Sequence, residues 1–134
     1  MRIPADSILL DCQGLSLLLR RDRGMGAMME RARSRDVPVF ASILTVMEAA
    51  HGRIDRAHLN YVLSRLYSVE EVTREDGMMG LNLMRSAGVA GHSHAIDAAC
   101  AALALRLPGR PAVYTSDPDD WWLLLGDRAL IVPL

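Results

Sequence analysis

The feature that most constrains the fold of this chain is a set of short apolar runs separated by longer segments with helical periodicity. Four of these runs are only five to seven residues long and rich in aliphatic side chains: 7–11 (SILLD), 37–41 (VPVFA), 111–115 (PAVYT) and 128–134 (RALIVPL). A weaker, alternating run lies at 68–73 (SVEEVT). Runs of this kind predict strands, and strands alternating with helices predict an α/β fold with a mainly parallel sheet.

Helical patterns occupy the intervals between the runs. We expect helices at 14–22, 24–36, 43–51, 56–67, 74–87, 94–107 and 117–126. Ser42 and Asp55 are predicted N-caps, Pro118 suits a first helical position, and Gly52 and Gly88 are typical residues after a helix end. The expected order is β-α-α-β-α-α-β-α-α-β-α-β, in one domain over residues 1–134.

Composition narrows the classes of function. The net charge of −1 argues against a nucleic-acid binder that works by overall basic charge, although local basic patches remain open. All 15 Lys and Arg residues are arginine, which excludes any mechanism that needs a lysine. Cys12 and Cys100 lie in apolar stretches and are interpreted as buried free thiols in a reducing cytosol. No signal peptide and no apolar segment of about 20 residues is visible, so we expect a cytoplasmic protein that does not span a membrane.

Four acidic residues lie in segments that are otherwise apolar. Asp11 and Asp117 each end an apolar run, Glu48 is the sole charge between residues 43 and 50, and Asp97 is the sole charge among Ala, Ile, Cys and Leu. A carboxylate on a largely buried segment must be protonated, paired or bound to a metal, because an unpaired buried charge is costly. Other acids are expected in water: Asp22, Glu30, Asp36, Glu70, Glu71, Glu75 and Asp127.

Topology predicts that these four carboxylates converge. In open parallel sheets, ligands bind outside the carboxyl ends of the strands, where Asp11 and Asp117 are expected. Glu48 is expected within two turns of a helix start, and Asp97 in the first turn or so of its helix. Such a group indicates a Mg²⁺ or Mn²⁺ site. The alternatives are that Asp11 and Asp117 cap the following turns and that Glu48 and Asp97 pair with arginines.

Four segments together resemble the acidic motifs of the PIN-domain family, most closely its VapC-type toxins. They are ILLDCQGL, VFASILTVMEAAHG, GHSHAIDAACAALA and VYTSDPDDW, in that order and spacing over nearly the whole chain. The resemblance implies a PIN-like three-layer α/β/α fold with a mainly parallel five-stranded sheet. It also implies a Mg²⁺-dependent (or Mn²⁺-dependent) endoribonuclease, the toxin of a type II toxin–antitoxin pair, with an antitoxin partner and a homodimeric state.

The resemblance also implies roles for individual residues. Asp11, Asp97 and Asp117 would hold one or two metal ions, and Glu48 would orient or deprotonate the attacking water, to give 5′-phosphate and 3′-hydroxyl products. Asp120 and Thr115 match auxiliary positions beside the last motif. His94 stands three residues before Asp97, where many members carry an additional acid. That departure bears on a second metal position, and His94 could face the acidic pocket and modulate it.

Further patterns carry weaker predictions. The arginines that include Arg20, Arg21 and Arg23 are either a solvated face, an RNA-backbone contact or a landing point for an acidic antitoxin segment. Methionines 25, 28 and 29 are expected in the core or in an adaptable groove, and the two tryptophans are expected to divide between core and surface. His92 and His94 have a spacing that could ligate zinc, but a role at a loop or helix start is favoured.

Two other functions are considered. A PIN-like module that binds RNA or a protein without cleaving RNA remains an alternative. A phospho-acceptor receiver domain has similar length and fold class, but receivers need a lysine at the end of the last strand, and this chain has none.

Overall fold

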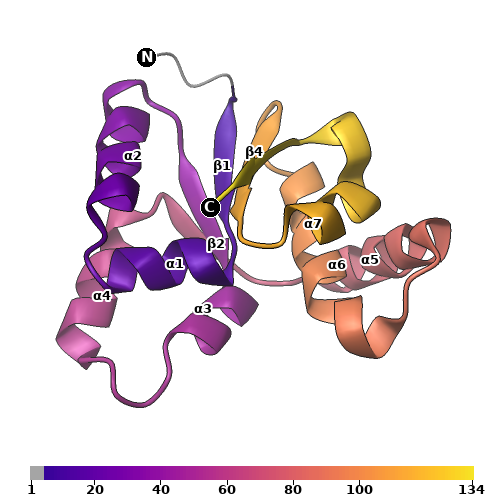
Figure 1. The fold of residues 1–134 in the computed structure, drawn as a ribbon, viewed down its shortest axis with the longest axis horizontal. Helices are drawn as coiled ribbons and strands as arrows, with labels where there is room; N and C mark the ends of the chain where they lie inside the picture. Colours follow the sequence, from indigo (N-terminus) through magenta and orange to yellow (C-terminus); the bar gives the residue numbers. More distant parts are fainter. Residues whose placement is uncertain (1–4) are drawn as a thin grey trace.

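The computed structural model describes residues 5–134, which form an α/β fold around one five-stranded sheet (Figure 1). The strands are β1 (Ser7–Leu10), β2 (Val39–Ser42), β3 (Ser68–Glu70), β4 (Pro111–Thr115) and β5 (Leu130–Pro133). Their order across the sheet is β3-β2-β1-β4-β5, and every neighbouring pair is parallel. The predicted fold class is therefore confirmed, and the sheet is parallel throughout.

The helices follow the predicted order. They are α1 (Cys12–Leu19), α2 (Arg23–Ser34), α3 (Ile43–Ala49), α4 (Arg56–Arg65), α5 (Arg74–Ala87), α6 (Gly91–Leu105) and α7 (Pro118–Leu125), with a short 3₁₀ turn η1 (Gly126–Arg128) before β5. The largest difference in a helix start is at α6, which begins three residues before the predicted position. Asp97 is consequently the seventh residue of α6, in its second turn rather than its first.

Local signals in the sequence explain most helix boundaries. Five helices begin with a side chain that accepts a backbone N–H; these N-caps are Asp11, Asp22, Ser42, Asp55 and Thr73. Each satisfies an N–H group that has no partner within the helix. At the other end of α5, Gly88 adopts a left-handed conformation (φ +69°), which glycine reaches without strain. The predicted roles of Ser42, Asp55 and Gly88 are confirmed.

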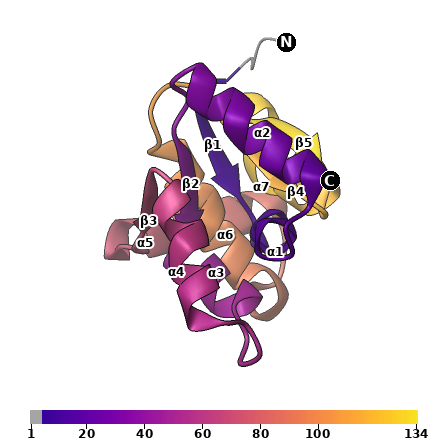
Figure 2. The same ribbon diagram turned by 90° about the vertical axis from the view of Figure 1, so that its left-hand side faces the viewer.

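Alternate residues of the strands pack against different helix layers. Leu9, Phe40 and Val113 face the core formed with α5, α6 and α7. Ile8, Leu10, Val39, Ala41 and Ala112 face the opposite core, which includes the methionines of α2. Both views show the sheet between these layers (Figures 1 and 2). The arrangement is the three-layer α/β/α sandwich expected of a parallel sheet buried on both faces.

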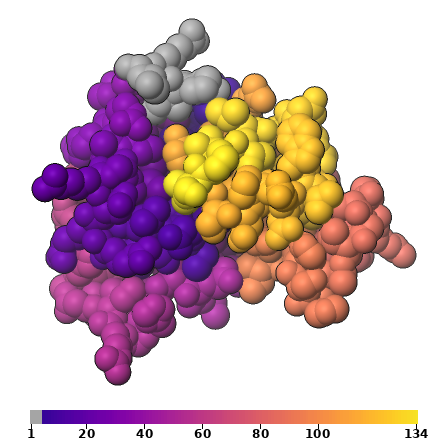
Figure 3. Space-filling view, viewed as in Figure 1, coloured from indigo at the N-terminus to yellow at the C-terminus, as the bar shows by residue number. Residues whose placement is uncertain are grey.

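The C-terminal segment of the chain completes one face of the molecule. The space-filling view shows α7 and β5 lying between the N-terminal helices and the α5–α6 pair (Figure 3). Trp121 on α7 is buried at 1% exposure, whereas Trp122 is 57% exposed, so the prediction that the tryptophans divide between core and surface is confirmed. None of the helices in residues 5–134 has the length and apolar character needed to cross a bilayer.

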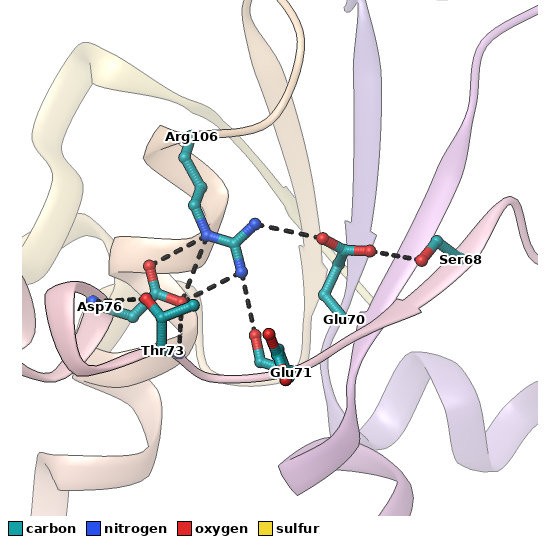
Figure 4. Close-up of polar contacts among 6 residues, drawn as sticks. All are labelled: Ser68, Glu70, Glu71, Thr73, Asp76 and Arg106. Atoms are coloured by element: carbon teal, nitrogen blue, oxygen red, sulfur yellow. Dashed lines mark hydrogen bonds and ion pairs between the residues drawn. The ribbon is translucent and has the colours of Figure 1, made fainter.

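Glu70 was predicted in water but is partly buried and paired. Glu70, at the end of β3, accepts from Arg106 Nη1 at 3.1 Å and from the Ser68 hydroxyl (Figure 4). The prediction for Glu70 is wrong because Arg106, just after α6, is brought beside β3 by the fold. The same arginine also pairs with Asp76, an almost fully buried acid on α5 for which the sequence analysis predicted no partner.

Candidate active site

The candidate site lies where the direction of the strand order reverses. The chain moves from β1 to β2 and β3 on one side of the sheet, while β4 and β5 lie on the other side of β1. In open α/β sheets the crevice at the carboxyl ends of such strands is the usual ligand site. Leu10 is in register with Tyr114, and the Asp11 N–H donates to the Tyr114 carbonyl at 3.1 Å. The residues that follow β1 and β4 are thus held side by side.

One cavity of about 390 Å³ at this edge is lined by all four predicted acids, Asp11, Glu48, Asp97 and Asp117. Two follow strands that pair directly, and two come from α3 and α6. They are separated by up to 106 positions in the sequence, so only the fold brings them together. The predicted convergence of these acids on one edge of the sheet agrees with the arrangement in the structure.

The two strand-end aspartates occupy capping positions with different bonding. Asp11 is the N-cap of α1, and its Oδ1 accepts the Gly14 N–H at 3.2 Å. The capping alternative is therefore true for Asp11, although the residue also lines the cavity. Asp117 stands at the N-cap of α7, yet its side chain makes no capping hydrogen bond. Capping therefore does not account for the Asp117 carboxylate.

Thr115 links these two aspartates. Its side chain is fully buried, and its Oγ1 accepts the Asp117 N–H at 2.9 Å. The Thr115 side chain also hydrogen-bonds to the Asp11 carboxylate, where it opposes the effect of burial on the Asp11 pKa. A hydroxyl can donate one hydrogen bond while accepting another, so Thr115 serves both neighbours at once. This agrees with the auxiliary position predicted for it.

The electrostatics of the cavity oppose ionisation of Asp97 and Asp11. Burial, followed by the charges of Asp120, Asp117, Glu48 and Asp11, raises the pKa of Asp97 to about 6. Burial also raises the pKa of Asp11, against hydrogen bonds from Thr115 and nearby backbone amides. In residues 5–134 none of the four cavity acids forms an ion pair with an arginine or histidine. The arginine-pairing alternative for Glu48 and Asp97 is wrong within this part of the chain.

The four acids differ in burial. Asp11 and Asp97 are half-buried, while Glu48 and Asp117 are exposed. The expectation that all four occupy costly positions is thus wrong for Glu48 and Asp117. Glu48 is the sixth residue of α3; Thr45, Val46 and Ala49 of this helix are buried, whereas Glu48 is exposed and lines the cavity. The cavity therefore has a half-buried floor and an exposed acidic rim.

The carboxylates do not form a ready-made coordination sphere. Across residues 5–134, no three His, Cys, Asp or Glu side chains are grouped tightly enough to hold a metal ion as they stand. The donor chemistry still favours a hard cation, because the four acids supply only oxygen. Mg²⁺ keeps several waters and is commonly bound through one or two carboxylates together with substrate phosphates. A loosely spaced carboxylate cavity fits that mode.

His94 lies beside Asp120, outside the cavity lining. Its Nε2 is 3.7 Å from Asp120 Oδ1, and its Nδ1 is 2.9 Å from the Ser93 hydroxyl oxygen. His92 and Ser93 do line the cavity, as residues of the first turn of α6. The helix-start role favoured for these histidines is confirmed. His94 does not line the cavity, so it does not face the pocket as the sequence analysis considered; Asp120, its neighbour, is the charge with the largest effect on the pKa of Asp97.

Both cysteines also line the cavity, which the sequence analysis did not foresee. Cys100 is buried as predicted, and burial raises its pKa to about 11. Cys12 is only half-buried, so the prediction for it is wrong; its pKa is raised by burial and by Glu48, Asp11 and Asp97. Both thiols are protonated at neutral pH and are poor nucleophiles. The adjacency of Cys12 to the strand-end Asp11 was the signal that could have placed it here.

The predicted basic residues lie away from the acids. Arg20, Arg21 and Arg23 are exposed around the end of α1, and Asp11 stands at its beginning. Eight helical residues separate these ends by about 12 Å. Arg21 has a left-handed backbone (φ 58°), and its Nη2 lies 3.4 Å from His58 Nδ1. His58 in turn contacts the Leu19 carbonyl through Nε2 at 2.8 Å, which joins α4 to the end of α1.

Comparison of the sequence with protein-family models gives no match, and comparison with curated proteins gives no match either.

Proposed function

We propose that this chain is a Mg²⁺-dependent endoribonuclease of the PIN/VapC type. The supporting observation is the gathering of Asp11, Glu48, Asp97 and Asp117 around one cavity at the switch point of a parallel sheet. The order and spacing of the motifs that carry these acids add to this support. Mn²⁺ is the alternative cation, because it accepts the same oxygen ligands.

The four acids and Thr115 each have a role in the proposed reaction. Asp11, Asp97 and Asp117 would hold the cation, which supplies Lewis-acid polarisation of the phosphate and a more acidic water. Thr115 holds Asp11 and the Asp117 backbone in place. Glu48, exposed at the rim, would accept the proton of the attacking water. The water oxygen bonds to phosphorus, the bond from phosphorus to O3′ breaks, and the products carry a 5′-phosphate and a 3′-hydroxyl.

The proposal extends to the biological setting. A cytoplasmic toxin of this type would be neutralised by a cognate antitoxin and would act as a homodimer. Exposed apolar side chains suit such contacts; they are present on α3 (Met47), α5 (Met78) and α7 (Trp122). The arginines Arg20, Arg21 and Arg23 would contact RNA phosphates outside the cavity, since they are exposed and carry no carboxylate partner among residues 5–134.

A second candidate is a PIN-like module that binds RNA or a protein without cleaving. It is favoured by the loose spacing of the acids, because no three ligand side chains are grouped within residues 5–134. The two candidates differ in one measurable property. A nuclease requires the cation and the carboxylates for turnover, whereas a binding module retains its function when they are removed.

The test is cleavage of single-stranded RNA by the purified protein in Mg²⁺, Mn²⁺ or EDTA. We expect cleavage with either cation and none in EDTA. Asp11→Asn and Asp117→Asn should abolish cleavage while circular dichroism shows an intact fold. Asp119→Asn is the matched control, because Asp119 lies in the same loop–helix junction but does not line the cavity. Cleavage by both cavity variants at the rate of the control would exclude the proposed mechanism.

A further inference from the structure

The helices α5 and α6 pack against each other along one face of α5, which we call the stripe: Asp76, Gly80 and Met84. Asp76, Gly80 and Met84 recur every four residues and so share one face of α5. Asp76 pairs with Arg106 just after α6, Gly80 lies against Ala98, and the end of the Met84 side chain lies beside Gly91. The two helices therefore run antiparallel, and the middle contact of the stripe falls one residue from Asp97.

That middle contact leaves too little room for a side chain on α5 unless the α6 backbone gives way by a few tenths of an ångström. A Cβ atom at Gly80 would stand 3.0 Å from the Ala98 carbonyl oxygen, 3.1 Å from the Ala98 carbonyl carbon and 3.2 Å from the Ala99 nitrogen. All three are backbone atoms, which cannot swing aside as a flexible side chain would. Ala98 is itself fully buried against the core. A larger residue at 80 must therefore displace the α6 backbone at 98–99 or push the two helices apart.

The Asp76 end of the stripe is fixed by Arg106 and its partners Asp76, Glu70 and Glu71, which we call the Arg106 group (Figure 4). Arg106 Nε donates to both carboxylate oxygens of Asp76, at 3.0 and 3.2 Å, and Nη2 donates to the Glu71 carbonyl at 2.9 Å. Asp76 also completes a capping box with Thr73 at the start of α5. Because this end is anchored, α5 cannot slide along α6 to relieve crowding at Gly80.

We propose that Gly80 is a positioning residue for Asp97. Because Gly80 has no side chain, α5 packs close to the α6 backbone, and this close packing places the Asp97 carboxylate in the cavity with Asp11 and Asp117. Gly80 does not line the cavity and acts through the backbone of Ala98 and Ala99. The effect of Gly80 on the position of the α6 backbone does not depend on the proposed function, whereas its effect on cation binding rests on that function.

Gly77 provides a matched control on the same helix. It is exposed, and a Cβ atom there would meet nothing within 4 Å. Glycine within a helix costs about 1 kcal/mol relative to alanine, so Gly77→Ala and Gly80→Ala both remove the same backbone penalty. The two substitutions then differ in one respect only, which is the contact of the new methyl group with α6.

The experiment measures Mn²⁺ binding by calorimetry without RNA, together with RNA cleavage and crystal structures of both variants. Gly77→Ala should match the parent protein in Mn²⁺ affinity and cleavage rate. Gly80→Ala should lose about tenfold in both, the range found when groups supporting metal ligands are altered. In its crystal structure the α6 backbone at 97–99 should be displaced away from α5. A stability effect alone would leave Mn²⁺ affinity unchanged at temperatures well below unfolding.

Equal Mn²⁺ affinity of the two alanine variants would overturn the positioning role. If the parent protein neither binds Mn²⁺ nor cleaves RNA, the proposed function fails instead, and the crystal structures still decide whether Asp97 moves relative to Asp11. Should Gly80→Ala not fold, Arg106→Lys tests the same point, because it keeps the charge but loses the forked pair with Asp76. Arg106→Lys should also lower the Mn²⁺ affinity, and an unchanged affinity would contradict the proposal.

Discussion

The Asp117 amide donates a 2.9 Å hydrogen bond to the side-chain oxygen of Thr115, two residues before it at the end of β4. The same threonine side chain hydrogen-bonds to the Asp11 carboxylate. One hydroxyl therefore holds the backbone of Asp117 and the side chain of Asp11, two acids that follow neighbouring strands. Thr115 is fully buried, so its hydroxyl must find its hydrogen-bond partners within the protein. The position of both acids thus depends on a residue that contributes no charge.

Replacing Thr115 by valine should weaken cation binding more than replacing it by serine. Each change should cost about 1–2 kcal/mol of unfolding free energy, valine through the lost hydrogen bonds and serine through the lost methyl group. Only valine removes the hydroxyl that lowers the Asp11 pKa, so protons should then compete better with Mn²⁺. Calorimetry of Mn²⁺ binding at pH 6 and pH 8 measures this. Equal affinities for the two variants would contradict the role assigned to the hydroxyl.

Asp97→Asn should make the cation-free protein more stable at pH 8 than the parent. The pKa of Asp97 is raised to about 6 from an ordinary 3.8, so the folded state binds this proton more tightly than the unfolded chain does. The Asp97 contribution to stability is therefore fully present below about pH 4 and is lost as the pH rises through about 6. This increase in the Asp97 pKa corresponds to a loss of roughly 3 kcal/mol at most in the free energy of unfolding at pH 8.

Urea unfolding in EDTA at several pH values measures that difference. The advantage of Asp97→Asn should shrink steadily toward pH 4, where the parent side chain is also neutral. Adding Mn²⁺ should stabilise the parent at pH 8 but not the variant. A constant difference between the two proteins across this pH range would exclude Asp97 as the source.

Arg106→Gln should destabilise the fold by about 2–4 kcal/mol, because it leaves the Asp76 carboxylate, 3% exposed, without its charged partner. Burial alone would raise the Asp76 pKa, but hydrogen bonds from Arg106 and Thr73 outweigh it and hold the pKa below its ordinary value. The stabilising contribution is therefore present above about pH 4 and is lost at lower pH.

Arg65→Gln is the control for this measurement. It breaks the 2.8 Å pair with Glu30, whose side chain is 66% exposed, and should cost less than about 1 kcal/mol. Urea denaturation at pH 7 compares the two variants. Similar losses for both would show that the Arg106 group is no more than a surface ion pair.

Replacing Arg20, Arg21 and Arg23 by glutamine should weaken RNA binding without changing Mn²⁺ affinity, because these residues lie at the far end of α1 from Asp11. Binding to single-stranded RNA in EDTA should lose about 2 from the slope of log affinity against log salt. Arg33→Gln with Arg35→Gln removes charge at the opposite end of α2 and serves as the control. An unchanged slope in the triple variant would assign the RNA contact elsewhere.

The sequence was sufficient to predict the strands, their parallel arrangement and the edge at which the acids meet. Short apolar runs ending in an acid locate Asp11 and Asp117, because parallel strands present their carboxyl ends together. Burial was less predictable: Glu48 looked buried among apolar neighbours, but α3 turns its sixth residue outward. The exposed fraction of a helical residue depends on which neighbouring helices cover it, and that is not a local property.

The Arg106 group and the Gly80 contact could not be predicted from the sequence. Arg106 and Asp76 are 30 residues apart, and neither segment carries a pattern that distinguishes a buried pair from solvated charges. In the sequence, Gly80 is only a glycine that weakens an amphipathic helix. The close approach of the α6 backbone, which explains a glycine at this position, is visible only in the fold. Both features depend on the packing of two helices, which follows from the complete fold.

The pairing of β1 with β4 also has a consequence for biosynthesis. The two strands are about 100 residues apart in the chain, and β2 and β3, on the other side of β1, are made before β4 exists. Contacts this distant in sequence form late, because a long loop must close before they bring any gain. A ribosome-bound chain that has not yet released β4 has Asp11 but neither Asp117 nor Thr115 beside it. Assembly of the acidic cavity is thereby delayed until β4 and Asp117 have been made and released, so a shorter nascent chain carries no complete site.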